Sequence, residues 1–318
     1  MSNKLDVPFG NAICYSGYRE GQDPRAEIFP SYEQVKEDLL ILARHWQYLR
    51  IYDCSPHADL VLQVIANDQL PLKVMLGADV AAEVSNPQCP WGADFEEAVL
   101  EDNRRRNSEQ IDRMIVLANE HPDSVFAVSV GNEATVEWTD HLVPEETLVS
   151  FVERIKAAGV KQPVTFCENY DPWTYKLQRL STVLDFLSVH TYPAWEFVHI
   201  DSALDYTRSN YNSVARSHPD KPVIITEAGW TTASNGRGIE PHNASRELQD
   251  AYFQQLTRWS EEEGILTFVF EAFDEPWKGS SHSNEPEKHW GLFDVHRRPK
   301  LVMEKLYSDL RQSAESAA

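Results

Sequence analysis

The chain has 318 residues, of which 42% are hydrophobic and 25% are charged, and its formal net charge is −21. This composition is that of an ordinary globular protein with a sizeable core. The acidic balance argues against nucleic acid as a partner, because phosphates are bound by Lys and Arg. It equally disfavours anionic membranes and anionic polymers, so we expect an uncharged partner.

The four cysteines, Cys14, Cys54, Cys89 and Cys167, lie far apart without CxxC spacing, which indicates neither a zinc site nor a redox pair. We expect Cys14, Cys54 and Cys167 to be small buried residues in strands. Residues 1–10 contain no apolar signal-peptide core, and no apolar run reaches transmembrane length. A chain that natively starts here would be cytoplasmic, and one trimmed from a longer product would be periplasmic or secreted.

Short apolar runs alternate with longer amphipathic runs from end to end. The predicted strands are Ala12–Tyr18, Tyr48–Cys54, Leu72–Ala78, Val125–Val130, Val164–Cys167, Phe186–His190, Val223–Thr226 and Leu266–Phe270. The predicted helices are Ser31–Trp46, His57–Asp68, Phe95–Glu120, Pro144–Ala158, Pro172–Leu180, Asp201–Ser217, Ala244–Glu263 and Lys300–Gln312. Ser31 can cap the first of these helices, and Gly159 and Gly264 mark turns after two others.

Eight nearly continuous apolar strands that alternate with eight helices indicate a parallel sheet covered on all sides. The α/β class and a single (β/α)8 TIM barrel over residues 1–318 account for this count in one domain. The structural alternative is a doubly wound open sheet, which usually has a Gly-rich phosphate loop after its first strand. The sequence contains no GxGxxG, so the barrel is favoured.

Two of the predicted strands lead into a glutamate. The run 125–130 is followed by Gly131, Asn132 and Glu133, and the run 223–226 is followed by Glu227. Most glutamates are solvated surface groups, but a polar pair that closes a buried strand costs stability unless it has partners. In a barrel the two carboxylates would face each other across the mouth, where one can protonate a leaving oxygen while the other attacks or activates water.

Five segments at predicted strand ends share a recognisable pattern. They are Arg50-Ile51-Tyr52-Asp53, Val130-Gly131-Asn132-Glu133, His190-Thr191-Tyr192-Pro193, Ile225-Thr226-Glu227-Ala228-Gly229-Trp230 and Phe270-Glu271-Ala272-Phe273-Asp274-Glu275-Pro276-Trp277-Lys278. Together they resemble glycoside hydrolase family 17, within the clan of retaining glycosidases built on (β/α)8 barrels. The resemblance spans strands two to eight. The Glu227 motif departs from the plant pattern, because Ala228 follows the glutamate and Thr231 follows Trp230 where plant members have Thr and Pro. The last segment is more similar to fungal and bacterial members, some of which are transglycosylases.

The resemblance implies a retaining enzyme that acts on β-1,3-glucan, with Glu133 as the acid/base and Glu227 as the nucleophile. Asn132 would donate a hydrogen bond to the sugar 2-hydroxyl. The hydroxyl of Tyr192 would hold Glu227 ionised by hydrogen bonding.

Further residues of these segments and of the loops between them are candidate substrate-binding residues. Arg50 and Tyr52 would hydrogen-bond the nucleophile or a sugar, and the alternative for Arg50 is a structural ion pair with Asp53. Aromatic side chains after strand ends would stack on sugar faces, and the alternative is that they pack loops onto the barrel; they are Tyr170, Trp173, Tyr192, Trp195, Trp230, Phe273 and Trp277. One or two charged residues after strand eight would bind sugar hydroxyls while the others hold the loop; they are Glu271, Asp274, Glu275 and Lys278.

No metal ion or other cofactor is predicted, because His190, His242, His282 and His289 match no metal-binding spacing. His190 is expected to hydrogen-bond within the site. The predicted substrate is a neutral laminarin-type β-glucan or its oligosaccharides, and segments 77–95 and 231–244 are candidate walls of the cleft. The alternatives are a β-1,3-glucan glucosyltransferase with the same covalent intermediate and a non-catalytic glucan-binding barrel.

Overall fold

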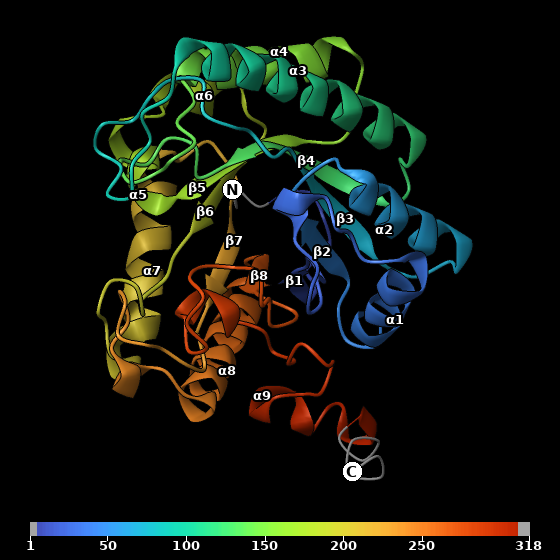
Figure 1. Ribbon diagram of the computed structural model, residues 1–318, viewed down its shortest axis with the longest axis vertical. Coiled ribbons are helices and arrows are strands. Elements are labelled where there is room, and N and C mark those ends of the chain that lie inside the picture. The colour runs from blue at the N-terminus through green and yellow to red at the C-terminus, as the bar shows by residue number, and fades with distance from the viewer. Residues whose placement is uncertain (1–4, 311–318) are drawn as a thin grey trace.

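The computed structural model describes residues 5–310 and confirms the TIM barrel (Figure 1). Eight parallel strands pair in chain order, and the first closes against the eighth. The strands are β1 Ala12–Cys14, β2 Tyr48–Ile51, β3 Lys73–Gly77, β4 Val125–Asn132, β5 Val164–Asn169, β6 Leu187–His190, β7 Val223–Gly229 and β8 Thr267–Phe270.

Helices surround the barrel, with α3 and α4 lying along one side and α1 and α2 beside β2 and β3 (Figure 1). The helices are α1 Tyr32–Leu42, α2 Pro56–Asn67, α3 Glu97–Glu120, α4 Glu145–Ala157, α5 Tyr170–Tyr175, α6 Gln178–Val183, α7 Ile200–Ser217, α8 Arg246–Glu263 and α9 Leu301–Glu304. Short 3-10 turns occupy Pro24–Ala26, Pro241–Asn243 and Pro286–Lys288. None of the helices between residues 5 and 310 is both long and apolar enough to span a bilayer.

Local sequence explains where several helices begin and end. The Ser31 side chain accepts from the backbone of Gln34 while the Gln34 side chain accepts from the backbone of Ser31, which is a capping box at the start of α1. Ser55 and Ser245 cap α2 and α8 in a similar way. Gly264 ends α8 with a φ of 63°, in the left-handed region that favours glycine.

Four predicted elements differ most from the structure. The strand predicted to reach Tyr18 ends at Cys14, and β2 ends at Ile51, so Cys54 lies after its strand; Cys54 is nevertheless buried and free, as are the other three cysteines. The segment 172–180 forms parts of α5 and α6, because Leu177 leaves helical geometry with a ψ of 40°. The helix predicted over 300–312 is α9, which is much shorter, and its predicted end lies outside the described residues.

The strand pairing slips at the C-terminal end of the barrel. Along β6 and β7, Val189 pairs with Ile225 but the next residue, His190, pairs with Glu227. The pairing of β4 with β5 shifts just before Asn132, and that of β7 with β8 shifts between Ile225 and Ala228. An extra residue on one strand redirects the side chains that follow it. These irregularities therefore set the directions of the side chains at the mouth.

Small side chains on β1, β5 and β6 are buried and hydrogen-bonded. Cys14 donates from its thiol to the carbonyl of Thr226, and Thr165 and Ser188 hydrogen-bond to each other, all of them fully or almost fully buried. At Gly229 a Cβ atom would lie 2.0 Å from the carbonyl oxygen of Phe270. Only glycine allows β7 and β8 to approach this closely. β7 carries Glu227, and β8 leads directly into Glu271.

Candidate active site

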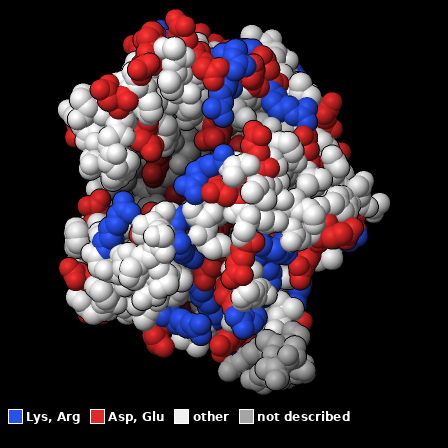
Figure 2. Space-filling model, in the orientation of Figure 1, with Lys and Arg blue, Asp and Glu red and all other residues white. Residues whose placement is uncertain are grey.

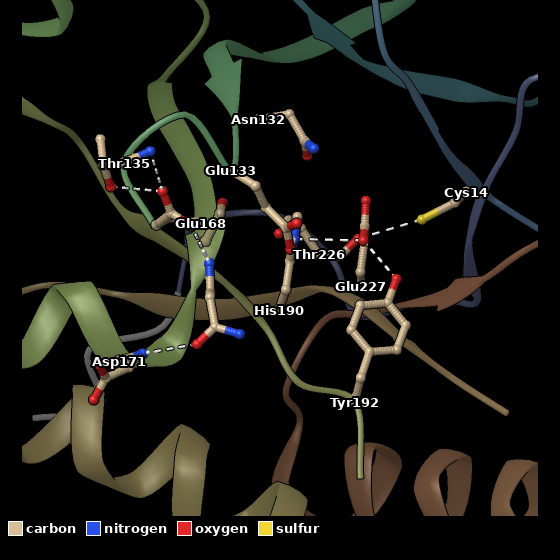
Figure 3. A network of polar contacts seen from close by, with 12 residues as sticks. Cys14, Asn132, Glu133, Thr135, Glu168, Asp171, His190, Tyr192, Thr226 and Glu227 are labelled. Atoms are coloured by element: carbon tan, nitrogen blue, oxygen red, sulfur yellow. Dashed lines mark hydrogen bonds and ion pairs between the residues drawn. The ribbon is translucent and has the colours of Figure 1, made fainter. Parts of the chain in front are cut away.

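Glu227 lies in β7 at the mouth of the barrel and is only 5% exposed (Figure 3). One carboxylate oxygen, Oε1, accepts hydrogen bonds from the Tyr52 hydroxyl at 2.9 Å and from the guanidinium of Arg50. The other, Oε2, accepts from the Tyr192 hydroxyl at 2.5 Å and lies 3.4 Å from Nδ1 of His190. The hydrogen bond predicted from Tyr192 is present, and Arg50 pairs with Glu227 rather than with Asp53.

The charges around Glu227 favour its ionised form. Burial alone would raise its pKa, but the charges of His190 and Arg50 and the hydrogen bond from Tyr192 outweigh burial and lower the pKa to about 2. Burial would lower the pKa of His190, but the nearby Glu227 carboxylate and the hydrogen bond to Glu133 contribute to raising it to about 10. At neutral pH the carboxylate is therefore ionised and the imidazole is protonated.

Glu133 follows β4 directly, and its side chain is 27% exposed. Its φ is +44°, in the left-handed region, which costs a non-glycine residue roughly 1–3 kcal/mol. The backbone N–H of Glu133 donates to the carbonyl of Cys167 at 2.9 Å, and its Oε1 lies 2.7 Å from Nδ1 of His190. Strain of this kind persists only where the surrounding structure fixes it.

Glu133, His190 and Glu227 come together at the mouth (Figure 3). One oxygen of each carboxylate and one ring nitrogen of His190 all lie within 4.8 Å of one another. Carboxyl groups about 5–5.5 Å apart are typical of retaining glycosidases, whereas roughly 6.5–9.5 Å is typical of inverting ones. The close spacing fits the retaining arrangement.

The same three groups have a spacing that could hold a metal ion, and no other such cluster occurs among residues 5–310. Because the pKa of His190 is raised to about 10, its imidazolium already supplies a positive charge between the two carboxylates. Holding a metal there would first require His190 to lose a proton.

Arg50, in β2, links β4 and β7 through its guanidinium. Its side chain is 3% exposed and donates to Glu227 and to the side-chain oxygen of Asn132. Since the amide oxygen of Asn132 is occupied in this way, its NH2 group is left to donate to a ligand. The guanidinium also lies over the Tyr52 ring, 4.4 Å from its centroid.

The charged residues after β8 form an ion-pair cluster. Nζ of Lys278 lies 2.7 Å from a carboxylate oxygen of Glu271 and 2.7 Å from one of Glu275, and both carboxylates are almost fully buried. Asp274 instead pairs with Nζ of Lys300 at 2.7 Å. These contacts hold the loop, which is the role expected for part of the cluster.

Glu287, in the 3-10 turn Pro286–Lys288, was missed by the sequence analysis. Burial raises its pKa to about 7, with Lys278 opposing and the charges of Glu133 and Glu227 adding to the rise. Its carboxylate is therefore electrostatically coupled to Glu133 and Glu227. No motif recognised in the sequence extended to this residue.

The predicted aromatic residues divide into two groups. Trp230 and Phe273 are each 1% exposed; Trp230 donates from its indole to the carbonyl of Asn243, and Phe273 packs on Phe293. The prediction that these two stack on sugars is wrong, because the core covers their rings. Trp173 is likewise buried in the core.

The second group stays partly exposed at the mouth. Tyr170, Tyr192, Trp195 and Trp277 are half-buried. Their rings contact other aromatic side chains: Tyr170 contacts Tyr206, Tyr192 and Trp195 contact Trp290, and Trp277 contacts Tyr18. Substrate contact stays a prediction for these four.

Two further residues that the sequence analysis did not select lie against the Glu133 segment. Glu168, in β5, is fully buried and accepts from the backbone N–H and the hydroxyl of Thr135 at 2.9 and 2.6 Å (Figure 3). Burial, with the charge of Glu133, raises the pKa of Glu168 to about 7. His141, in the loop after β4, contacts the carbonyl of Asn132. The sequence did hold a signal for Glu168, since it also closes an apolar strand.

The face shown in Figure 2 is hollowed, with acidic side chains inside the hollow and both acidic and basic side chains along its edge. A parallel (β/α)8 barrel with two carboxylates this close at the ends of β4 and β7 defines a glycoside hydrolase. The chain belongs to the family described as the BtgE/BtgC glycoside hydrolase domain, whose profile matches residues 12–291. This family match and the similar proteins described next confirm the resemblance to glycoside hydrolase family 17.

The chain is similar to a probable glucan endo-1,3-beta-glucosidase btgC of Aspergillus clavatus, with 26% identity over 298 residues. The match covers 85% of this chain and 39% of that protein, so the chain spans about two fifths of the length of the curated relatives it matches. Among solved structures it is similar to an endo-laminarinase from a Formosa strain, with a TM-score of 0.81 and 29% identity over 94% of this chain and 87% of that one.

A β-1,3-glucanosyltransferase of Rhizomucor miehei, solved as an active-site mutant in complex with laminaritriose, shares the fold. Its TM-score is 0.71 at 24% identity, over 92% of this chain and 96% of that one. At this identity the likeness is one of fold.

Proposed function

We propose that the protein cleaves β-1,3-glucosidic bonds of laminarin-type glucan or its oligosaccharides by double displacement, with retention at the anomeric carbon. The observation that carries the proposal is the closeness of the two carboxylates, since one oxygen of Glu133 lies within 4.8 Å of one oxygen of Glu227. The substrate class is supported by the similar glucan endo-1,3-beta-glucosidase and endo-laminarinase and suits a chain of net charge −21. Residues 1–318 would act as one catalytic domain.

In the first step Glu227 attacks the anomeric carbon while Glu133 delivers a proton to the glycosidic oxygen. The carbon–oxygen bond breaks, the leaving sugar takes the proton, and a glucosyl ester forms on Glu227. A carboxylate with a pKa near 2 is ionised and ready to attack. A proton can be held between Glu133 and Nδ1 of His190, which lie 2.7 Å apart.

In the second step Glu133 takes a proton from the incoming hydroxyl, whose oxygen attacks the anomeric carbon and releases Glu227. The free NH2 group of Asn132 would bind the sugar 2-hydroxyl in both steps, a contact that strengthens in the transition state. If water is the acceptor the reaction is hydrolysis, and if a glucan hydroxyl is the acceptor it is transglycosylation. The fold shared with a β-1,3-glucanosyltransferase keeps transfer as the second candidate.

The two roles are tested by azide rescue of alanine variants acting on an aryl β-glucoside with a good leaving group. Glu227→Ala should yield the α-glucosyl azide, because azide takes the place of the nucleophile. Glu133→Ala should yield the β-glucosyl azide, because azide attacks an intermediate already formed on Glu227. Without azide we expect Glu227→Gln to lose roughly 10⁴-fold or more in kcat and Glu133→Gln about 10²–10⁴-fold.

Swapped azide products would reverse the two roles, and full activity in either glutamine variant would sink the mechanism. Products formed from a laminari-oligosaccharide separate the two candidate reactions. Shorter products alone support hydrolysis, and products longer than the substrate support transfer.

A further inference from the structure

We propose that His141 is a positioning residue for the acid/base, because it holds the Asn132–Glu133 peptide and with it the direction of the Glu133 carboxylate. The inference rests on the role proposed for Glu133 and adds to it. His141 lies in the loop between β4 and α4, and its side chain is 36% exposed.

The peptide bond between Asn132 and Glu133 is held on both sides. Its carbonyl oxygen, from Asn132, accepts from Nε2 of His141 at 2.9 Å. Its N–H, from Glu133, donates to the carbonyl of Cys167 in β5 at 2.9 Å. Turning this peptide plane over would change ψ of Asn132 and φ of Glu133 together, and would take φ of Glu133 from +44° into the negative range that side chains prefer. The two hydrogen bonds therefore oppose the motion that would relieve the strain.

The residues that follow Glu133 are held by different groups. Thr135 donates to Glu168 from its backbone and its hydroxyl, and its own carbonyl accepts from Nζ of Lys176 at 2.5 Å. These contacts fix the chain beyond Glu133 but do not touch the carbonyl of Asn132. Among the contacts of residues 5–310, His141 is the one side chain that donates to that carbonyl.

The charge of His141 is set by the groups that face it. Nε2 must carry a proton because it meets a carbonyl oxygen, and Nδ1 lies 2.8 Å from a carboxylate oxygen of Asp140 and 3.1 Å from the hydroxyl of Thr139. Asp79, from the loop after β3, adds negative charge. Burial acts to lower the pKa of His141, but these partners outweigh it and raise the pKa. The imidazolium satisfies both sides of the ring.

The sign of the pH effect follows from the raised pKa. The stabilisation is fully present below the ordinary pKa of histidine, 6.5, and is lost as the pH rises through the raised value. Deprotonation would leave Nδ1 without a proton opposite Asp140, and the loop would hold the peptide less firmly.

The test compares two substrates with the same glucosyl donor and different leaving groups. A laminari-oligosaccharide needs a proton from Glu133 to leave, whereas a 2,4-dinitrophenyl β-laminaribioside does not. Measured as kcat/KM, His141→Ala should lose on the order of 10–100-fold on the oligosaccharide, as expected for a misplaced catalytic group. On the dinitrophenyl substrate it should lose less than about threefold, because that step needs no general acid.

His141→Gln should recover most of the loss, since a glutamine amide N–H can reach the carbonyl of Asn132. Because glutamine does not titrate, the part of the alkaline fall in rate that comes from deprotonation of His141 should be absent in this variant. The matched control is His199→Ala: His199 also contacts an aspartate, Asp201, at 3.3 Å, but it is exposed and stands at the start of α7. This control should leave both rates unchanged.

Equal losses on the two substrates in His141→Ala would overturn the inference, as would a glutamine variant that recovers nothing while its melting temperature matches wild type. Glu133→Ala separates this failure from failure of the proposed function. If Glu133→Ala loses activity on the oligosaccharide but keeps it on the dinitrophenyl substrate, while His141→Ala loses the same on both, only the inference about His141 fails. If Glu133→Ala loses the same activity on both substrates, the acid/base role of Glu133 fails and the inference fails with it.

Discussion

Glu227 and Glu133 stand at the ends of β7 and β4 and share one neighbour, His190, but the protein holds them in different ways. Glu227 is almost fully buried and is fixed through its side chain, which accepts from Arg50, Tyr52 and Tyr192. Glu133 is more exposed and is held mainly through its backbone, in a left-handed conformation. The Glu227 carboxylate is thus fixed by hydrogen bonds and ion pairs to its side chain, whereas the direction of the Glu133 carboxylate is set mainly by its backbone conformation.

This difference suits the two proposed roles. A nucleophile must stay ionised and fixed, so partners that donate to it and neutralise it are useful throughout the cycle. An acid/base must gain and lose a proton, so a dense set of charged partners would hinder it. Among residues 5–310, His190 is the one charged side chain that pairs with the Glu133 carboxylate, whereas Glu227 is paired with both Arg50 and His190.

The largest expected effect comes from removing the charge that fixes Glu227. Arg50→Met leaves a buried carboxylate without its guanidinium partner, and we expect a loss of roughly 3–5 kcal/mol in the free energy of unfolding. The pKa of Glu227 should rise, and kcat/KM should fall by about 10²–10³-fold. Urea unfolding and initial rates measure the two effects.

The matched control is Arg44→Met, because Arg44 pairs with Asp309 at the surface and should change neither quantity measurably. Unchanged stability in Arg50→Met would mean that Tyr52, Tyr192 and His190 hold the Glu227 carboxylate without the guanidinium. The proposed role of Arg50 in fixing Glu227 would then be wrong.

A smaller effect is expected from the residue that both carboxylates share. The raised pKa of His190 stabilises the fold below pH 6.5, and the stabilisation is lost as the pH rises through about 10. The lowered pKa of Glu227 acts in the opposite range, since its contribution is present above 4.5 and is lost as the pH falls through about 2.

In the wild type, the free energy of unfolding should therefore fall by a few kcal/mol as the pH rises from 6.5 through about 10. In His190→Asn the alkaline loss should disappear. An equally steep alkaline loss in the variant would show that another group causes it.

The smallest effect concerns the backbone and should have opposite signs at the two sites. At position 133, glycine tolerates a φ of +44°, so Glu133→Gly should be more stable than Glu133→Ala by about 1–2 kcal/mol. At position 227, within a strand, Glu227→Gly should be less stable than Glu227→Ala by roughly 0.5–1 kcal/mol. Thermal unfolding of the four variants measures both differences. If glycine changes the stability in the same direction at both positions, the left-handed backbone of Glu133 does not distinguish it from Glu227.

The sequence by itself determined the barrel and the two glutamates. Eight apolar runs alternate with amphipathic ones. A short continuous apolar run is typical of a strand that is covered on both faces, and an amphipathic run is typical of a helix with one buried face. The C-terminal ends of parallel strands must meet at one mouth of a barrel, so Glu133 and Glu227 could be paired before any contact was known. Motifs at the strand ends also led to Asn132, Arg50 and Tyr192, whose side chains are found at the mouth.

Only the tertiary structure decided how these residues are held. The slips in strand pairing beside Asn132, His190 and Glu227 depend on how neighbouring strands meet when the barrel closes, and no local pattern records them. Closure also buried Trp230 and Phe273, because exposure depends on which loops cover a ring rather than on its place after a strand. The contacts of His141 and Glu168 likewise join segments that are neighbours only in the folded chain. Residue type and spacing can place a catalytic group at a strand end, but its direction and charge come from neighbours that folding brings to it.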